Sequence, residues 1–257
     1  VVIYRFNTGK SMISGRSICM NCNRNLRWYE LIPVFSFLIQ SGKCRRCASK
    51  ISYQYIIVEF LTGLVFTLIA FKFFPIFYFS NILYMLYVVL FVFMFSVLIV
   101  ISVYDLRHKV IPDKLVFAFI LVSFFSIFIN PYIFGPIIIL PSLSAFISGP
   151  IISLPFVLIW FFSRGRLMGL GDGKLALGLG WMLGLSEGVF AMLLAFCIGS
   201  VVSLSIMFLS KAMPRLIKSK KISMKTEIPL APFLITGAFI TFLFNLDIFS
   251  LINFFGM

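Results

Sequence analysis

Two aspartates with unusual surroundings are the candidates for chemistry in this sequence. Asp105 follows a long apolar run and is therefore expected at a helix C-terminus, and Asp172 lies in the segment 169–174 (GLGDGK) between two further apolar runs. A carboxylate beside a membrane-length apolar segment is costly, and is therefore a candidate functional group. Two carboxylates that share a site can divide the work, because one stays ionised and activates water while the other holds a proton. The pair predicts hydrolysis of the aspartic-protease type.

Each aspartate also has an ordinary structural explanation. Asp105 can pair with Arg107 or Lys109, and Asp172 can cap the helix that follows it. Capping does not account for the three glycines around Asp172, which would let the backbone bend closely around a reacting group. We therefore expect an active-site loop formed by Gly169, Gly171, Gly173 and Lys174.

Two other residues near Asp105 are assigned no chemical role. Asp113 follows Pro112, and a proline followed by an acid is ordinary chemistry for a helix start. His108 is the only histidine of the chain, and we expect it to be a loop residue at the membrane interface. Neither a Ser-His-Asp nor a Cys-His mechanism therefore competes with the aspartate pair.

Four of the five cysteines form two Cys-x-x-Cys pairs, which predict a metal site. Cys19 pairs with Cys22 and Cys44 with Cys47, and 21 residues separate the pairs. Four thiolates at this spacing can bind Zn²⁺ tetrahedrally, and such a closed site folds a small domain and performs no chemistry. Two disulfides are the alternative. Thiols stay reduced in the cytosol, so a cytosolic position favours zinc.

The composition predicts an all-α polytopic membrane protein. Hydrophobic residues make up 61% of the chain and charged residues 12%, against about half and about a quarter in soluble domains. We expect about seven membrane helices, from the apolar spans 55–71, 81–104, 115–130, 137–162, 175–185, 189–210 and 228–246. The expected domains are the end of a truncated first membrane helix (1–4), a cytoplasmic four-cysteine zinc domain (5–54) and a membrane-embedded domain with both aspartates (55–257).

Three apolar segments depart from a simple spanning helix. The span 175–185 is only about 16 Å long, so we expect it to extend into the segment 169–174. The span 137–162 contains three prolines and should be kinked or broken. The segment 31–39 is too short to cross a bilayer, and either lies along the membrane surface or packs under the zinc knuckle.

The basic residues predict the orientation. If the cysteine segment is inside, 21 of the 22 Lys and Arg residues lie inside, and Lys72 alone lies outside. This distribution follows the positive-inside rule and puts both aspartates on the cytoplasmic side. The net charge of +14 serves orientation in this interpretation. No basic patch stands outside the membrane pattern, so we expect no nucleic-acid partner and a lipid bilayer as the surroundings.

The order of the motifs resembles the bacterial type IV prepilin peptidases, which are membrane aspartic proteases of the GxGD class. The resemblance starts in the stub 1–5 and includes both cysteine pairs with the segment 31–36 between them. It continues through the segments 59–63 (EFLTG), 111–113 (IPD) with Asp105 before it, 169–174 (GLGDGK) and 228–238 (IPLAPFLITGA). The chain departs from the family in lacking most of the first helix and in having Ala231 where the family often has glycine.

The resemblance implies a specific activity. Asp105 and Asp172 would be the catalytic pair that removes short basic leaders from prepilins and pseudopilins of type IV pili and type II secretion. The reaction would take place on the cytoplasmic side of the bacterial inner membrane. Family members that have the four cysteines also methylate the new N-terminus with S-adenosylmethionine, and the resemblance implies the same activity for this chain.

Two alternatives stay open at this stage. We place Glu59 near the methyl-transfer region as a cofactor-binding residue, because a lone Glu in an apolar run is unusual. A structural partner such as Arg45 or Lys50 is the alternative for Glu59. For the whole chain, the alternative is a non-enzymatic transporter or assembly scaffold with a zinc-bound domain, whose ion sites would lie near the membrane midplane.

Overall fold

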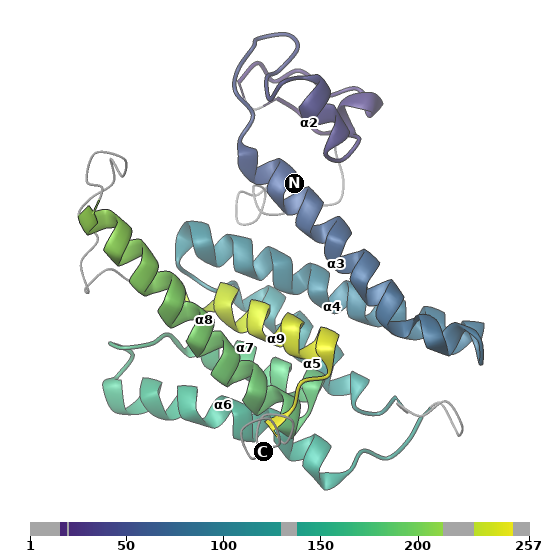
Figure 1. Cartoon of the computed structure of the whole chain (residues 1–257), viewed down its shortest axis with the longest axis vertical. Coiled ribbons are helices and arrows are strands. Elements are labelled where there is room, and N and C mark those ends of the chain that lie inside the picture. The colour runs from purple at the N-terminus through teal and green to yellow at the C-terminus, as the bar shows by residue number, and fades with distance from the viewer. Residues whose placement is uncertain (1–15, 20, 130–137, 213–228, 249–257) are drawn as a thin grey trace. The chain divides into compact units, whose positions relative to one another are not determined.

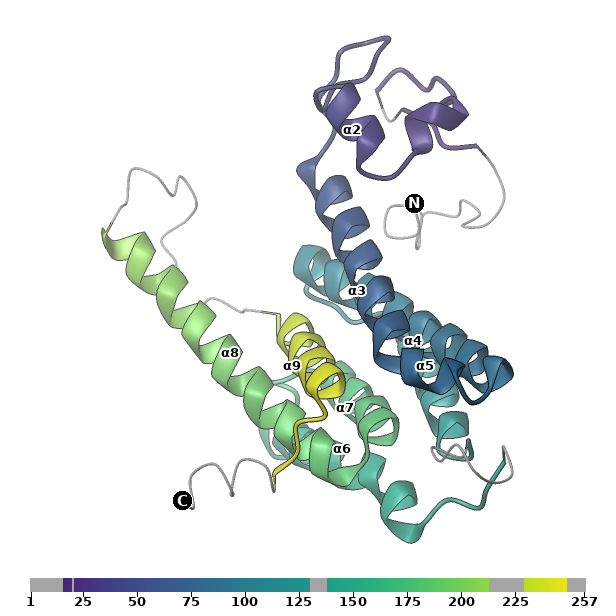
Figure 2. The same cartoon turned by 45° about the vertical axis from the view of Figure 1, so that its right-hand side comes forward.

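The structure is a computed structural model that describes residues 16–19, 21–129, 138–212 and 229–248. The chain divides into two compact units, Val1–Phe73 (unit 1) and Phe74–Met257 (unit 2). All regular elements among the described residues are helices, and β pairing there is limited to isolated bridges. The predicted all-α fold is confirmed (Figures 1 and 2). Residues 1–4, the predicted end of a first membrane helix, lie outside the described residues.

Unit 1 contains the cysteine segment and the start of the first long helix. The 3₁₀ helix η1 covers Trp28–Leu31 and is followed by the short helix α2 (Phe35–Ile39). Helix α3 (Tyr53–Phe77) then begins in unit 1 and ends in unit 2. The apolar segment 31–39 is therefore too short a helix to cross a bilayer, as predicted.

Unit 2 is a bundle of six apolar helices in the part of the chain that the structure describes. They are α4 (Asn81–His108), α5 (Asp113–Ser126), α6 (Leu143–Ser163), α7 (Leu170–Leu183), α8 (Leu185–Ala212) and α9 (Ala231–Phe244). Together with α3 they match the seven predicted spans. Only α3, α4, α6 and α8 are long and apolar enough to cross a membrane. The other three have 14 residues each, or about 21 Å, against about 30 Å of hydrocarbon.

Helix α7 lies at the centre of this bundle. It packs against α5, α6, α8 and α9, and half of its residues are buried, including Leu175, Ala176 and Leu179. A helix that is covered by protein on several sides does not need to match the full thickness of the bilayer. Its first residue is Leu170, so the short span extends into the GLGDGK segment as predicted.

Glycines let the helices of unit 2 approach closely. A Cβ atom at Gly180 of α7 would lie 2.8 Å from the Cα atom of Gly149 of α6. The Ser148 hydroxyl uses this approach to donate a hydrogen bond to the Gly180 carbonyl at 2.9 Å. At the contact of α8 with α9, a Cβ atom at Gly237 would lie 2.6 Å from the Ala191 carbonyl oxygen. Small residues at helix contacts are a general device of membrane proteins, because lipid supplies no hydrophobic force between helices.

The span 137–162 was predicted to be kinked or broken by its prolines, and its helix begins only after Pro141. Helix α6 continues from Leu143 through Pro150 and Pro155 to Ser163. Pro150 has no N–H for the carbonyl of Phe146, four residues earlier, and a free carbonyl in an apolar setting is costly. The Trp181 indole Nε1 of α7 donates a hydrogen bond to that carbonyl at 2.9 Å. A neighbouring helix thus replaces the bond that the proline removes.

This replacement predicts a coupled effect on stability. Trp181→Phe keeps an aromatic side chain but leaves the Phe146 carbonyl without its donor. This change should lower the free energy of unfolding by about 1–3 kcal/mol. Pro150→Ala restores an N–H in the helix, so the same Trp181→Phe change should cost much less in that background. Unfolding of the four proteins of this cycle in mixed micelles measures the coupling. Equal costs in both backgrounds would contradict the assigned bond.

Candidate functional site

Asp105 lies in the last turn of α4 and is buried. The residue is only 4% exposed. The Asp105 carbonyl accepts the Lys109 N–H at 2.8 Å, and Lys109 ends the helix in the left-handed conformation, at φ 53°. The prediction that Asp105 is at a helix C-terminus is confirmed.

The carboxylate of Asp105 is held by the start of α9. Its Oδ2 atom accepts a hydrogen bond from the backbone N–H of Ala231 at 3.3 Å. Ala231 is the first residue of α9 and is fully buried. The first N–H groups of a helix have no partner within the helix, and the positive end of the helix favours a nearby anion. Sequence reasoning missed this contact. The proline at 232 signals a helix start there, but nothing in the sequence tells which acid that start faces.

Asp172 lies in the first turn of α7, with Gly169 as the residue before the helix. Gly169, Gly171, Gly173 and Lys174 stay a prediction as active-site residues, but the expected loop conformation is wrong, because all but Gly169 are helical. The glycines serve close packing instead. A Cβ atom at Gly171 would lie 3.0 Å from the Cβ atom of Ile111, and one at Gly173 would lie 3.3 Å from Val157 Cγ2.

The structure brings the two aspartates together. The carboxylate of Asp105 is near enough to act electrostatically on that of Asp172, which is half-buried. Their helices, α4 and α7, both pack against α5 and α9. Two acids of like charge are thus held at one end of unit 2, where α4 ends and α5, α7 and α9 begin. Such an arrangement favours one shared proton between the two carboxyl groups.

Beside the two aspartates, an ion pair joins Lys174 of the GLGDGK segment to Asp113 of the IPD segment. Lys174 Nζ on α7 lies 2.7 Å from Asp113 Oδ1 on α5 and 5.2 Å from the centre of the Phe117 ring. Asp113 is the first residue of α5, which confirms its interpretation as a helix-start residue. The ion pair with Lys174 was not predicted. Both side chains are partly exposed, so the pair joins the first turns of α5 and α7 without entering the buried site.

The four paired cysteines form two turns of the same geometry in unit 1. In the first, the Cys19 carbonyl accepts the N–H of Asn23, which is left-handed at φ 50°. In the second, the Cys44 carbonyl accepts the N–H of Ala48, which is left-handed at φ 53°. The N–H of each of these cysteines bonds the carbonyl five residues later, at 2.9 Å in both turns. The sequence thus folds into two matching knuckles that point their sulfur atoms inward.

The sulfur atoms are spaced for a metal ion. All four Sγ atoms lie within 4.8 Å of one another, and those of Cys19 and Cys47 are 3.8 Å apart. A tetrahedral Zn²⁺ with bonds of about 2.3 Å places its sulfurs about 3.8 Å apart, whereas a disulfide requires about 2.05 Å. Hydrogen bonds from Ser49 lower the pKa of the Cys47 thiol to about 6, which favours the thiolate that binds metals. The predicted four-cysteine cluster is confirmed as a group able to hold a metal.

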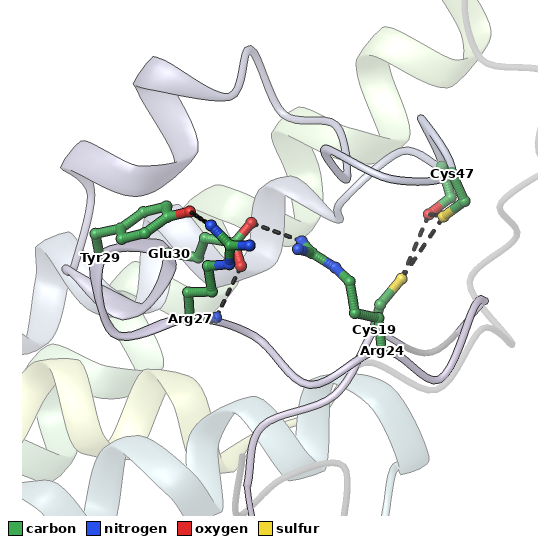
Figure 3. Close-up of polar contacts among 7 residues, drawn as sticks. Cys19, Arg24, Arg27, Tyr29, Glu30 and Cys47 are labelled. Carbon is green, nitrogen blue, oxygen red and sulfur yellow. Dashed lines mark hydrogen bonds and ion pairs between the residues drawn. The ribbon is translucent and has the colours of Figure 1, made fainter.

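A buried acid stabilises the chain beside the first knuckle, as Figure 3 shows. Glu30 of η1 is 6% exposed, and its Oε1 atom accepts a hydrogen bond from Arg24 Nη2 at 2.6 Å. Its Oε2 atom accepts the Arg27 N–H at 2.8 Å. Both oxygens of the buried carboxylate are therefore paired. Arg24, two residues after Cys22, thus ties the metal-binding turn to η1.

Glu59 also makes a hydrogen bond within unit 1. Its Oε2 atom accepts the backbone N–H of Val34 at 2.8 Å. Val34 directly precedes α2 and has a positive φ of 61°, which is strained for a β-branched residue. The backbone of Val34, not Arg45 or Lys50, is thus the partner in this hydrogen bond. The structure places Glu59 and the cysteines in unit 1, and Asp105 and Asp172 in unit 2.

Two family descriptions match the chain. Residues 1–73 match the bacterial peptidase A24 N-terminal domain, and residues 92–204 match the type IV leader peptidase family. The first region contains the four paired cysteines and Glu59. The second contains both Asp105 and Asp172. No solved structure matches the chain.

Several curated relatives carry the name prepilin leader peptidase/N-methyltransferase. The relative from Vibrio cholerae is 31% identical over 170 residues, which cover 66% of this chain and 62% of the relative. The chain thus spans less than two thirds of that protein in the alignment. The relative from Bacillus subtilis is 26% identical over 242 residues, or 93% of this chain and 86% of the relative. The relative from Dichelobacter nodosus is 28% identical over 265 residues, which cover 98% of this chain and 77% of the relative.

These matches favour the predicted enzyme over the transporter or scaffold. They agree with the four helices that are long and apolar enough to cross a membrane, and they indicate a protein of the bacterial inner membrane. The regions matched also carry the motifs on which the predicted resemblance rested. The chain belongs to the type IV leader peptidase family of bacteria.

Proposed function

We propose that the chain is a membrane aspartic endopeptidase that cleaves leader peptides from type IV prepilins and pseudopilins. The observation that carries this proposal is the juxtaposition of Asp105 and Asp172, two carboxyl groups at neighbouring helix ends in a largely buried site. The type IV leader peptidase match over residues 92–204 and the names of the relatives support the substrate class.

In the proposed mechanism the two aspartates are catalytic. The ionised carboxylate takes a proton from a water molecule, and the resulting hydroxide attacks the carbonyl carbon of the scissile amide. The protonated partner supplies the proton that the departing amine needs. The products are the leader with a new carboxylate and the mature chain with a new amine. The Ala231 N–H is a positioning contact, because it fixes one oxygen of Asp105.

The form of the substrate suits this site. A prepilin joins a basic leader to an apolar helix, so the helix can lie in the bilayer while the leader emerges at the membrane face. We propose that this face is cytoplasmic, since 21 of the 22 basic residues then lie inside. Purified chain in vesicles should release the leader from a prepilin, as read by the intact mass of the product. An unchanged prepilin mass would contradict the proposal.

We propose that the cysteine cluster holds Zn²⁺ and that the zinc is structural. The sulfur spacing supports this assignment, and four protein ligands would leave no open coordination position for a substrate. The residues 5–54 would then fold around the metal, and the residues 55–257 would form the peptidase domain. Only the second of these carries the acids that the mechanism uses.

We further propose that the chain methylates the new N-terminus with S-adenosylmethionine, which the names of the relatives support. When bound, S-adenosylmethionine supplies the methyl group. Glu59 is the candidate contact. Its Oε2 atom is taken by Val34, and the other oxygen suits a ribose hydroxyl. Titration calorimetry should detect binding of S-adenosylmethionine to wild type and weaker binding to Glu59→Gln. No binding to wild type would exclude this activity.

Asp113→Asn should leave cleavage within about threefold of wild type. The Asp113 side chain is 64% exposed, and such ion pairs contribute at most about 1 kcal/mol. Lys174→Met removes the other partner and should have an equally small effect. Initial rates of leader release measure both variants. Loss of cleavage in Asp113→Asn would give that acid a role in the chemistry.

A further inference from the structure

Unit 1 has an exposed apolar face beside the metal site. Six large side chains of η1, α2 and the link between them are between 40% and 78% exposed. They are Trp28, Leu31, Ile32, Phe35, Leu38 and Ile39. A cluster of this size on a small domain is unusual in water and marks an interaction surface.

The face results from the spacing of the residues. Phe35, Leu38 and Ile39 are spaced by three and four residues within α2, which places their side chains on one side of that helix. Phe37 points the other way, and its ring centre lies 5.6 Å from that of Tyr53 at the start of α3. The inward side chain thus fixes α2 to the unit, whereas Phe35, Leu38 and Ile39 are exposed.

Glu59 determines how deep this face lies. Helix α3 has 25 residues, or about 37 Å, against about 30 Å of hydrocarbon. About 7 Å of the helix is therefore left over and is shared between its two ends. Glu59 comes six residues after Tyr53, about 9 Å along the axis, which is within about one helical turn of the boundary between headgroups and hydrocarbon. Because Glu59 bonds the N–H of Val34, the start of α2 is held at this same depth.

The charges around the face suit an anionic bilayer. The described part of the chain between residues 16 and 52 has seven basic residues and one acid. The acid is Glu30, which is already paired with Arg24. Arg27, Lys43, Arg45, Arg46 and Lys50 are exposed. Basic side chains beside an apolar face with Trp and Phe are typical of segments that lie in the membrane interface.

We propose that the face formed by Trp28, Leu31, Ile32, Phe35, Leu38 and Ile39 is a membrane-interface anchor that inserts between anionic phospholipids. Glu59 is its positioning residue, because the bond to Val34 sets the depth of α2 on α3. This inference decides between the two predicted positions of the segment 31–39 in favour of the membrane surface. A second copy of the chain or a soluble partner would not require the face to be fixed at the depth of the bilayer boundary.

The test is photolabelling of the full chain in vesicles of phosphatidylethanolamine and phosphatidylglycerol. A trace phospholipid with a carbene-forming group high in its acyl chain is activated, and the adducts are mapped by mass spectrometry. We expect adducts within residues 28–39, at least about fivefold above those within residues 21–25. Replacing phosphatidylglycerol by phosphatidylcholine should lower the yield, because the basic residues then lose their attraction.

Two matched pairs of variants make the test specific. Leu38→Asp should lower the adduct yield several-fold, whereas Asn25→Asp adds the same charge at an exposed position outside the face and should not. Glu59→Leu removes the acceptor for Val34 and should lower the yield, whereas Glu59→Gln keeps an acceptor and should not. Metal content is measured for each variant, so that loss of folding is recognised separately.

Three results would overturn the inference. One is labelling of α3 with no adducts in residues 28–39. Another is a Leu38→Asp or Glu59→Leu variant that keeps its metal and is labelled like wild type. The third is crosslinking of two copies of the chain by a photoreactive residue placed at position 35, which would identify a second copy as the occupant. None of these outcomes depends on peptidase activity.

Discussion

Replacing either Asp105 or Asp172 by asparagine is expected to lower the rate of leader cleavage by at least about 10³-fold. Asparagine keeps the size of the side chain but cannot exchange a proton at neutral pH. The Ala231 N–H can still donate to an asparagine oxygen at position 105, so the site should keep its shape. The loss would therefore report chemistry and not folding.

The comparison requires evidence that the variants are intact. Membrane insertion and the midpoint of thermal unfolding should stay close to those of wild type for both. Asp113→Asn is the matched control, because it makes the same chemical change at an acid of the same end of unit 2. Retained cleavage in Asp105→Asn together with full loss in Asp113→Asn would show that the first catalytic acid is Asp113.

Loss of one cysteine ligand should remove the metal and unfold the knuckles of unit 1. Wild type is expected to carry one zinc per chain, and Cys44→Ser none, because a three-cysteine site holds the metal much more weakly. Structural zinc contributes about 10–16 kcal/mol in small zinc domains, which is more than such a domain gains from its core. Elemental analysis and the rate of proteolysis between residues 16 and 52 measure the two effects.

Cys197→Ser is the matched control for the metal. Cys197 lies on α8 outside the cluster, so this variant should keep its zinc and its resistance to protease. A wild-type protein without metal, with disulfides between the paired cysteines, would overturn the zinc assignment. It would also contradict the cytoplasmic orientation of the unit, because thiols stay reduced there.

The features that the sequence predicted well depend on composition and on short spacing. Long apolar runs predict helices with little ambiguity, and the apolar helices from α3 to α9 match the predicted runs, although only α3, α4, α6 and α8 of these described helices reach membrane length. Two Cys-x-x-Cys pairs predict a metal cluster, because each pair brings its own ligands together. The ends of helices at Asp105 and Asp113 could also be predicted, since proline and charge mark them locally.

The features that the sequence did not predict depend on contacts between distant segments. The glycines around Asp172 indicated a loop, but they are needed for packing against Ile111 and Val157. Likewise, nothing in the sequence shows that helix α6 can continue through Pro150, where Trp181 satisfies the carbonyl that the proline leaves free. A sequence pattern states what a residue permits in its own segment. It does not state which neighbour arrives from another helix.

The hydrogen-bond partners of the acidic side chains also could not be predicted from the sequence. Asp105 meets the N–H of Ala231, 126 residues away, and Glu59 meets the N–H of Val34. Both donors are backbone groups, which carry no signature in the sequence. Lys174 and Asp113 have opposite charges and belong to predicted motifs, so their pairing had a weak signal. Only the fold of unit 2 brings them within reach of each other.

The most direct test of the shared site is single-turnover cleavage of one prepilin at high enzyme concentration in vesicles. The rate is compared among wild type, Asp105→Asn, Asp172→Asn and the double variant. Groups that act as a unit have non-additive effects, so the double variant should retain the same residual rate as either single variant. A rate in the double variant that falls by the product of the two single losses would contradict one site shared by Asp105 and Asp172.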